Sequence, residues 1–181
     1  GGDPESGAVR AHNVSFADLY DQIASQLPEQ AMALLLYTLL HGNRDFLDYS
    51  LSRTDPETLV LPLLKLLHES RALPTARLYM LLILLLMLSQ DNGFVAACQT
   101  SRVANVPWYT SRRLGSVSVG SLIVIMLVRT VQANLAGSHD SYVHTNCLAA
   151  LANVAPSLRK LHPHAARCLI SLIDLFSRKY I

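Results

Sequence analysis

The amino-acid sequence predicts an all-α protein, and three observations lead to that prediction. Leucine supplies 34 of the 181 residues, whereas glycine and proline supply eight each. Apolar residues recur with the 3.6-residue period of helices in one segment after another. No run alternates between apolar and polar residues over a useful length. The predicted architecture is a multi-helix, right-handed section of an armadillo/HEAT-like solenoid, and an irregular helical bundle is the alternative.

The first part of the chain predicts three helices. A capping-box signature over 15–18 starts a helix whose apolar face runs to Leu27. Pro28 opens a second helix, which ends at 41–43. A short helix follows over about 44–52.

The clearest helix start in the chain is the sequence Thr-Asp-Pro-Glu at 54–57. It offers a hydroxyl cap from Thr54, a proline in the first turn and Glu57 at the third helical position. Inside this helix, Pro62 removes a hydrogen bond and clashes with the carbonyl group of Thr58. We expect a kink there or a restart of the helix at Pro62.

Two later helices are apolar on nearly every side. Pro74 opens the first, which is apolar all round over 78–88. A helix with no polar face has to be covered on every side, so we expect it to be central. Asn92 or Gly93 then ends it in the left-handed conformation. The second helix runs over about 117–135.

The last part of the chain predicts two amphipathic helices. Pro156 stops the first and Pro163 starts the second. The first has an apolar face of Cys147, Leu148, Leu151, Ala152 and Ala155. The second has an apolar face of Ala165, Leu169, Leu172, Ile173 and Phe176.

The spacing of helix starts favours a repeat protein. Starts near 28, 75 and 116 are 47 and 41 residues apart, inside the range of about 40–47 for armadillo and HEAT units. A solenoid also explains the low share of charged residues, 15% against a usual share of about 25%. Because an internal section of a solenoid exposes apolar ends, we expect the purified chain to be helical and to associate. An irregular bundle accounts for the same pattern.

Composition and charge exclude several classes of protein. The apolar share of 51% excludes intrinsic disorder. The cysteines Cys98, Cys147 and Cys168 form no CxxC pair, and we expect those on helices to be buried free thiols. The net charge of +2 comes from thinly spread Lys and Arg, so we predict no nucleic-acid partner. The longest uncharged apolar stretches, 78–90 and 114–128, reach roughly 20 and 22 Å against a hydrocarbon core of about 30 Å, so we predict no transmembrane span.

Side chains that would hold a metal or catalyse a reaction form no recognisable motif. His144 with Cys147, and His162 with His164, are close pairs, whereas a zinc site needs three or four converging ligands. No strand–turn–helix unit exposes a serine nucleophile, and no glycine-rich nucleotide-binding motif occurs. We predict that the protein is not an enzyme and that it binds no metal or cofactor.

One polar-aromatic cluster lies in a predicted loop and is the candidate partner surface. It consists of Trp108 and Tyr109, followed by Arg112 and Arg113. Trp, Tyr and Arg are the residue types that are enriched at binding hot spots. In the alternative interpretation, Trp108 fills a gap between helices and the arginines form a solvated edge.

Several segments resemble the dymeclin family, in the family's order and from about residue 14 to the end of the chain. They are LLLYTLLH (34–41), RTDPETLVLPLL (53–64), LSQDNGF (88–94), WYTSRRL (108–114), GSLIVIMLVRTVQ (120–132) and HTNCLAALANVAPSLRKLHPHAARCLISLIDLFSRK (144–179).

The resemblance implies a function as well as a fold. Dymeclin-like proteins are peripheral, Golgi-associated proteins that exchange with the cytosol and support Golgi organisation and trafficking, with a link to bone and brain development in animals. No catalytic residue is known for the family. We therefore expect a helical scaffold or adaptor section that binds protein partners, with Golgi membrane association through parts outside this section. The alternative is a cytosolic helical-repeat interaction module without a Golgi role.

The expected domain organisation is simple. Residues 1–13 form a flexible leader, and residues 14–181 form a single all-α domain. The chain does not begin with Met and resembles an internal section of the longer dymeclin proteins. We expect it to be a piece of a longer protein, whose other parts are among its partners.

Overall fold

A computed structural model describes residues 14–69 and 75–180 of the chain. This part of the chain is all-α, as predicted, with a 3₁₀ turn η2 at Ala155–Ser157. Strands β1 (Arg102–Val103) and β2 (Val117–Ser118) have two residues each. The helices are α1 (Phe16–Gln26), α2 (Gln30–Gly42), α3 (Arg44–Ser52), α4 (Glu57–His68), α5 (Thr75–Ser89), α6 (Asn92–Thr100), α7 (Val119–Ala136), α8 (Ser141–Val154) and α9 (Pro163–Tyr180).

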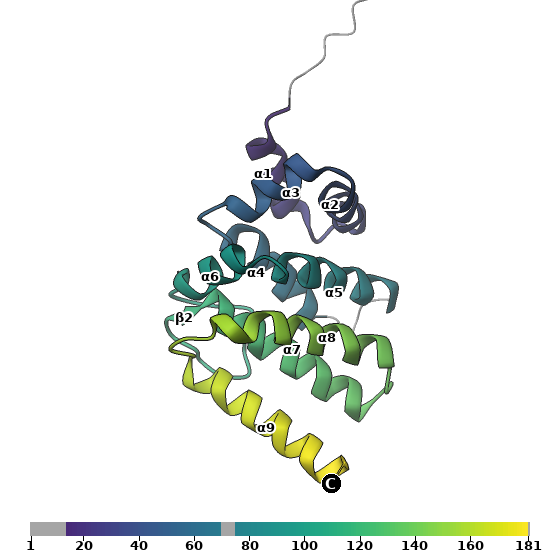
Figure 1. Ribbon diagram of the computed structural model, residues 1–181, viewed down its shortest axis with the longest axis vertical. Helices are drawn as coiled ribbons and strands as arrows, with labels where there is room; N and C mark the ends of the chain where they lie inside the picture. Colours follow the sequence, from purple (N-terminus) through teal and green to yellow (C-terminus); the bar gives the residue numbers. More distant parts are fainter. Residues whose placement is uncertain (1–13, 70–74, 181) are drawn as a thin grey trace, which may run out of the picture.

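The helices are stacked in layers along the longest axis of the molecule (Figure 1). Helices α1, α2 and α3 form the first layer and pack on α4, α5 and α6 respectively. In turn, α4 packs on α7 and α5 packs on α8, while α9 packs on the far side of α7. Five helices, α1 to α5, thus pack on the helix three places later, an arrangement that is typical of stacked repeats. The right-handed solenoid and the irregular bundle both stay predictions.

Helix α7 is the most enclosed element of this stack. Ten consecutive residues, 119–128, are buried, because α7 packs against α4, α6, α8 and α9. The sequence analysis expected the helix over 78–88 to be central, and no residue of that stretch is exposed. Both apolar helices are therefore covered by neighbours, as a helix without a polar face requires.

Helix α7 is also long and apolar enough to cross a membrane, judged by length and composition alone. The same test is passed by α5 and α6 as a pair bent by 98° at their junction. However, 67% of the α7 segment is buried inside the fold. A core helix of this length meets the same criteria.

The expected cap of α4 is wrong, and one of the two outcomes expected at Pro62 does not occur. The helix begins at Glu57 without a side-chain cap. The backbone N–H of Thr58 donates to the carbonyl oxygen of Asp55 (3.1 Å), and the Thr58 hydroxyl donates to Asp55 Oδ2 (3.0 Å). Asp55 takes the place of the expected Thr54 cap, because Arg53 holds its carboxylate in the turn. Arg53 Nε donates to Asp55 Oδ1 (2.7 Å), and Arg53 Nη2 donates to Asp55 Oδ2 (2.6 Å). Of the two outcomes expected at Pro62, the restart does not occur, since the helix continues through that residue, and the kink stays a prediction.

The junction after α5 differs from the expectation as well. Asp91 accepts a hydrogen bond from the N–H of Phe94 (2.7 Å) and so caps the start of α6. Asn92 and Gly93 consequently belong to the first turn of α6 and are not left-handed. The expected start at Pro74 and the leader over 1–13 lie outside the described residues.

The apolar face of α8 is rotated from the predicted one. Leu148 is 39% exposed, and Ala152 and Ala155 are exposed too. The buried face follows the spacing i, i+4, i+7, i+11 and consists of Val143, Cys147, Ala150 and Val154. Small residues on this face allow the close approach of α5 and α7.

Two of the three cysteines behave as the sequence predicts. Cys98 and Cys147 are free and buried, and Cys168 is half-buried. Burial raises the pKa of the Cys98 thiol and of the Cys147 thiol to about 12. These two thiols are therefore protonated and act as small apolar side chains of the core.

Candidate functional site

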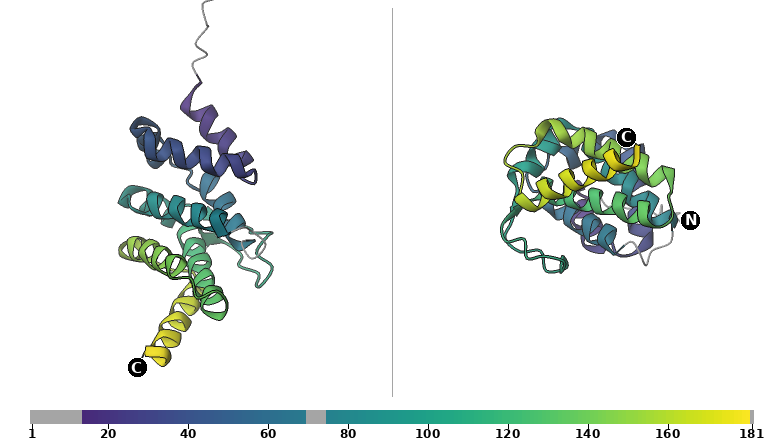
Figure 2. Two further views of the ribbon diagram at one scale, coloured as in Figure 1. Left: turned by 90° about the vertical axis from the view of Figure 1, so that its right-hand side faces the viewer. Right: turned by 90° about the horizontal axis from the view of Figure 1, so that it is seen from below.

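A loop between the two short strands contains all four residues of the predicted partner surface. The strands pair antiparallel, with Arg102 opposite Ser118 and Val103 opposite Val117. The strand pair closes the base of the loop, which projects from the side of the stack (Figure 2, right). Gly115 adopts a φ of +61° near the end of the loop, a conformation that glycine reaches without strain.

Tyr109 anchors this loop to the helices. It is only 4% exposed, and its hydroxyl accepts a hydrogen bond from Arg129 Nη1 (3.0 Å) and lies 2.8 Å from His164 Nε2. Burial, and then the positive charges of Arg112 and Arg167, lower the pKa of His164 below its usual range. The imidazole is therefore neutral at pH 7, and the Tyr109 hydroxyl and His164 Nε2 share one hydrogen bond. These bonds fix the loop to α7 and α9.

Trp108 is half-buried next to this anchor. Its ring meets the Tyr109 ring edge-on, with centroids 6.4 Å apart and planes at 87°. The His68 ring at the end of α4 lies 5.6 Å from both aromatic rings. Trp108 also lines an open groove of about 360 Å³, together with residues of α1 and α4 that include Leu61 and Pro62. The indole thus forms one wall of a largely apolar groove.

Arg112 and Arg113 are exposed at the tip of the loop. Within the described residues, neither makes an ion pair with a carboxylate. The structure therefore divides the four predicted residues into three roles. Tyr109 is an internal anchor, Trp108 is the wall of a groove, and the two arginines are solvated.

The paired histidines make backbone contacts in the described part of the chain. His144 Nδ1 lies 3.0 Å from the carbonyl oxygen of Asp140, and His162 Nε2 lies 3.0 Å from that of Leu114. Residues 14–69 and 75–180 contain no group of three or more His, Cys, Asp or Glu side chains that could hold a metal ion. The close pairs in the sequence thus fix loops to neighbouring elements.

The sequence analysis did not single out a second concave site. Arg102, Arg159 and Lys160 line one open cavity of about 600 Å³ between α6 and the α8–α9 connection. The residues come from two distant segments, so no local motif marks them. A count of charges for each half of the chain would have drawn attention to this region.

Comparison with known proteins gives a consistent result over nearly the whole length of the chain. A family model described as "Dymeclin: Dyggve-Melchior-Clausen syndrome protein" matches residues 3–181. Dymeclin of Rattus norvegicus is 41% identical over 175 residues, which is 97% of this chain and 26% of the relative. Dymeclin of Drosophila melanogaster is 38% identical over 177 residues, or 98% of this chain and 25% of the relative.

The similarity extends to a distant organism. Dymeclin of Dictyostelium discoideum is 36% identical over 168 residues, which is 93% of this chain and 18% of the relative. The chain thus spans about a quarter of the length of the first curated relatives that it matches. No solved structure matches it.

Proposed function

Because the chain belongs to the dymeclin family, we propose that it is a non-enzymatic scaffold or adaptor section of a cytoplasmic protein that associates peripherally with the Golgi apparatus. In this function the section binds protein partners and thereby supports Golgi organisation and intracellular trafficking. Dymeclin is not known as an enzyme family. In this proposal, parts outside this section supply the anchor that holds the protein at the Golgi membrane.

The anchored loop is the observation that best supports a binding function. Tyr109 holds the loop against α7 and α9, while Arg112 and Arg113 remain exposed. A surface that is already fixed loses little conformational entropy when a partner binds. The groove beside Trp108 would accept an apolar side chain of the partner, and the arginines would pair with its carboxylates.

The ends of the stack support a scaffold that continues beyond this section. Four large apolar side chains are more than half exposed, and all lie in the first or the last layer (Figure 1). They are Val14 (62%), Leu34 (55%), Ile170 (66%) and Ile173 (65%). Leu34 borders α5, beside Ala76 and Met80, whereas Ile170 and Ile173 lie on α9, the last helix of the stack. An exposed apolar end face such as that of α9 is what an internal section of a stacked helical protein presents. We propose that further helices of a longer chain cover the α9 face.

A replacement experiment tests the Golgi role. Cells that lack the full-length protein are given it back with or without Trp108→Ala, Arg112→Ala and Arg113→Ala. We expect the unchanged protein to restore the shape of the Golgi and the transit of a secretory cargo. We expect the triple variant to reach normal abundance without restoring either.

A matched control separates the loop from a general loss of surface side chains. Tyr142→Ala, Arg44→Ala and Arg178→Ala likewise remove one aromatic ring and two guanidinium groups, from exposed positions on other elements. This control should restore Golgi shape and cargo transit. If loss of the protein leaves both unchanged, the Golgi role is wrong and the cytosolic interaction module is correct. If the loop variant restores both, the loop is not the partner surface.

A further inference from the structure

Positive charge is concentrated in the second half of the chain. Residues 92–181 contain nine Lys and Arg but only two carboxylates, Asp140 and Asp174, whereas residues 1–91 contain six Lys and Arg and eleven Asp and Glu. Asp174 pairs with Arg178 on α9 at 2.9 Å, and Asp140 is bonded to Tyr79. The nine basic residues are Arg102, Arg112, Arg113, Arg129, Arg159, Lys160, Arg167, Arg178 and Lys179.

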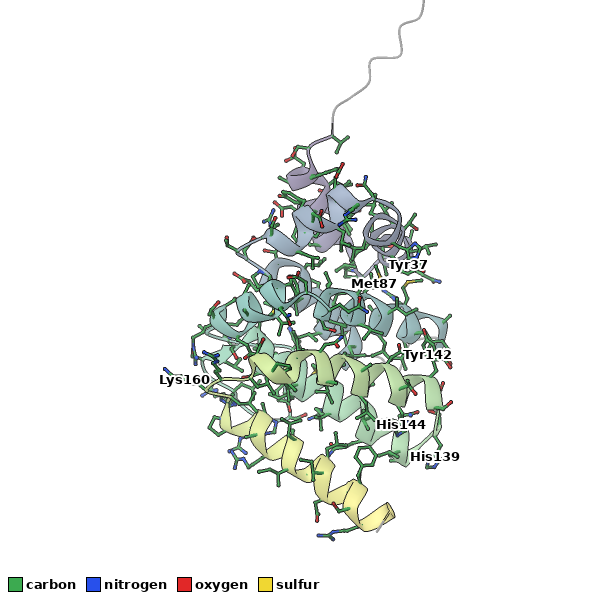
Figure 3. The ribbon with its side chains drawn as sticks, in the orientation of Figure 1. Tyr37, Met87, His139, Tyr142, His144 and Lys160 are labelled. Atoms are coloured by element: carbon green, nitrogen blue, oxygen red, sulfur yellow. The ribbon has the colours of Figure 1, made fainter. Side chains whose placement is uncertain are left out.

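The fold separates most of this charge from both carboxylates. The β1–β2 loop and the α8–α9 connection lie at the same edge of the molecule (Figures 1 and 2). Lys160 lies at this edge, and the α7–α8 turn with His139 lies at the opposite edge (Figure 3). Asp140 follows His139 directly, so its charge is far from Lys160.

At the basic edge, three cations line the cavity of about 600 Å³. They are Arg102 from β1, and Arg159 and Lys160 from the α8–α9 connection. No carboxylate lines the cavity, and none of the three cations makes an ion pair within the described residues. Glu57 accepts a hydrogen bond from Ser101 (2.6 Å), the neighbour of Arg102 in the chain, but makes no ion pair with Arg102. The positive charge in the cavity is therefore uncompensated.

The walls of the cavity are held in place on both sides. Ser116 accepts hydrogen bonds from Arg102 Nε through its hydroxyl (3.1 Å) and from Nη2 through its carbonyl (3.0 Å). These bonds orient the guanidinium group. On the other side, His162 is bonded through its backbone N–H to Ser121 Oγ (3.1 Å) and through its ring to Leu114. Lys160, two residues earlier, has a φ of +54°.

The floor of the cavity contains an unpartnered amide. Gln99 lines the cavity, and its Oε1 and Nε2 atoms are buried without a hydrogen-bond partner in the described part of the chain. The amide lies against Gly120, where a Cβ atom would come within 2.2 Å of Nε2. These amide atoms are covered and face Gly120 of α7, so the groups that a ligand in the open cavity would meet are the three cations at its rim.

We propose that this cavity binds a ligand with several phosphate groups, such as an inositol phosphate, either free or as the headgroup of a lipid. An oriented guanidinium matches two phosphate oxygens at once, and a lysine adds a mobile point charge. The volume lies inside the range of about 300–1,000 Å³ that is usual for small-ligand sites. This site is distinct from the Trp108 groove and does not depend on the proposed Golgi role.

The first experiment uses inositol hexakisphosphate and isothermal titration calorimetry on the purified chain. Arg159→Gln with Lys160→Gln should weaken binding at least about tenfold, because two charged donors are lost. Arg112→Gln with Arg113→Gln removes the same charge from the same edge but not from the cavity, and should change affinity by less than about twofold. Equal losses in both variants, or no binding by the unchanged chain, would overturn the proposal.

The second experiment identifies the source of the phosphate. Vesicles of phosphatidylcholine, with phosphatidylserine or with a phosphoinositide, are mixed with the chain and sedimented. Sedimentation with phosphoinositide vesicles only, and its loss in the Arg159→Gln, Lys160→Gln variant, assigns the site to a lipid headgroup. Binding to the soluble probe without sedimentation assigns it to a soluble phosphate. Equal sedimentation with phosphatidylserine vesicles would show diffuse attraction and contradict a specific site.

Discussion

At the scale of single residues, Tyr109 explains how a loop becomes a fixed surface. Its ring lies between the His68 ring of α4 and the Arg129 guanidinium of α7, whose centre is 5.2 Å from the ring centroid. Its hydroxyl joins Arg129 to the neutral His164 of α9. One side chain thus connects the loop to three helices from different layers.

Replacement of Tyr109 by Phe should destabilise the fold by about 1–3 kcal/mol, because a partly buried arginine and histidine lose a shared hydrogen-bond partner. The ring remains, so its packing against His68 and Arg129 is retained. Chemical denaturation of the variant measures the change. Tyr142→Phe is the control, since Tyr142 is 38% exposed and its hydroxyl makes no hydrogen bond within the part of the chain that the structure describes. A similar loss in both variants would contradict the anchoring role.

A second residue-scale prediction concerns acid stability. The hydrogen bonds from Arg53 hold the pKa of the Asp55 carboxyl below its usual range. The folded chain therefore binds fewer protons than the unfolded chain below the ordinary value of about 3.9. This contribution to stability is complete at neutral pH and is lost as the pH falls towards the lower, folded value.

Asp55→Asn should remove that part of the pH dependence and lower stability at pH 7. Urea denaturation between neutral and acidic pH gives the two profiles. Asp48→Asn is the matched control, because Asp48 is exposed and lies 3.9 Å from the exposed Arg44. Parallel profiles for the unchanged chain and Asp55→Asn would show that Asp55 contributes nothing to acid stability.

Residue-scale features were predictable where they depend on neighbours in sequence. The Ser15 cap is present, with Oγ accepting from the N–H of Asp18 (3.2 Å). The Thr54 cap failed because Asp55, one residue later, is bonded to Arg53 and Thr58. Trp108 and Tyr109 look alike in the sequence. Their different burial depends on His164, which lies far along the chain.

At the scale of elements, one side chain organises the turn between α7 and α8. Asn134 is 6% exposed and donates to the carbonyl oxygen of Asp140 (2.8 Å). Its side-chain oxygen Oδ1 accepts hydrogen bonds from the backbone N–H of Asp140 (3.0 Å) and from Ser138 Oγ (2.7 Å). The left-handed His139 lies inside this set of bonds, with a φ of 52°. The turn is therefore held from its centre.

Asn134→Ala should cost about 2–4 kcal/mol of stability, because three hydrogen bonds of a buried residue are lost together. Thermal and urea unfolding followed by circular dichroism provide the measurement. Gln132→Ala, on the same helix, removes one long hydrogen bond to Ser171 (3.5 Å) and should cost much less. If the two variants unfold together, Asn134 does not organise the turn.

Most helices were predictable because their period, caps and breakers are local. The buried face of α8, in contrast, could not be predicted from the sequence. Leu148 and Leu151 are larger than Ala150 and Val154, so hydrophobicity alone placed the face on the leucines. The fold buries the smaller pair instead, because α8 packs closely against both α5 and α7.

At the scale of the whole molecule, two properties come from the stacking of layers. The most exposed of the large apolar side chains belong to the first and last layers, and the basic residues gather at one edge. The association of the ends was predicted from the low overall charge. The basic edge was missed, because a net charge of +2 hides the opposite signs of the two halves.

The central claim is that this chain is a section of a longer helical scaffold whose end faces pack against more protein. Light scattering of the purified chain over a range of concentrations tests it most directly. We predict an average mass that rises with concentration, and a monomer when Ile170→Ser and Ile173→Ser remove the apolar face of α9. A chain with Leu148→Ser, which changes an exposed leucine in the middle of the stack, should still associate. An unchanged chain that stays monomeric at every concentration would contradict the claim and favour a self-contained bundle.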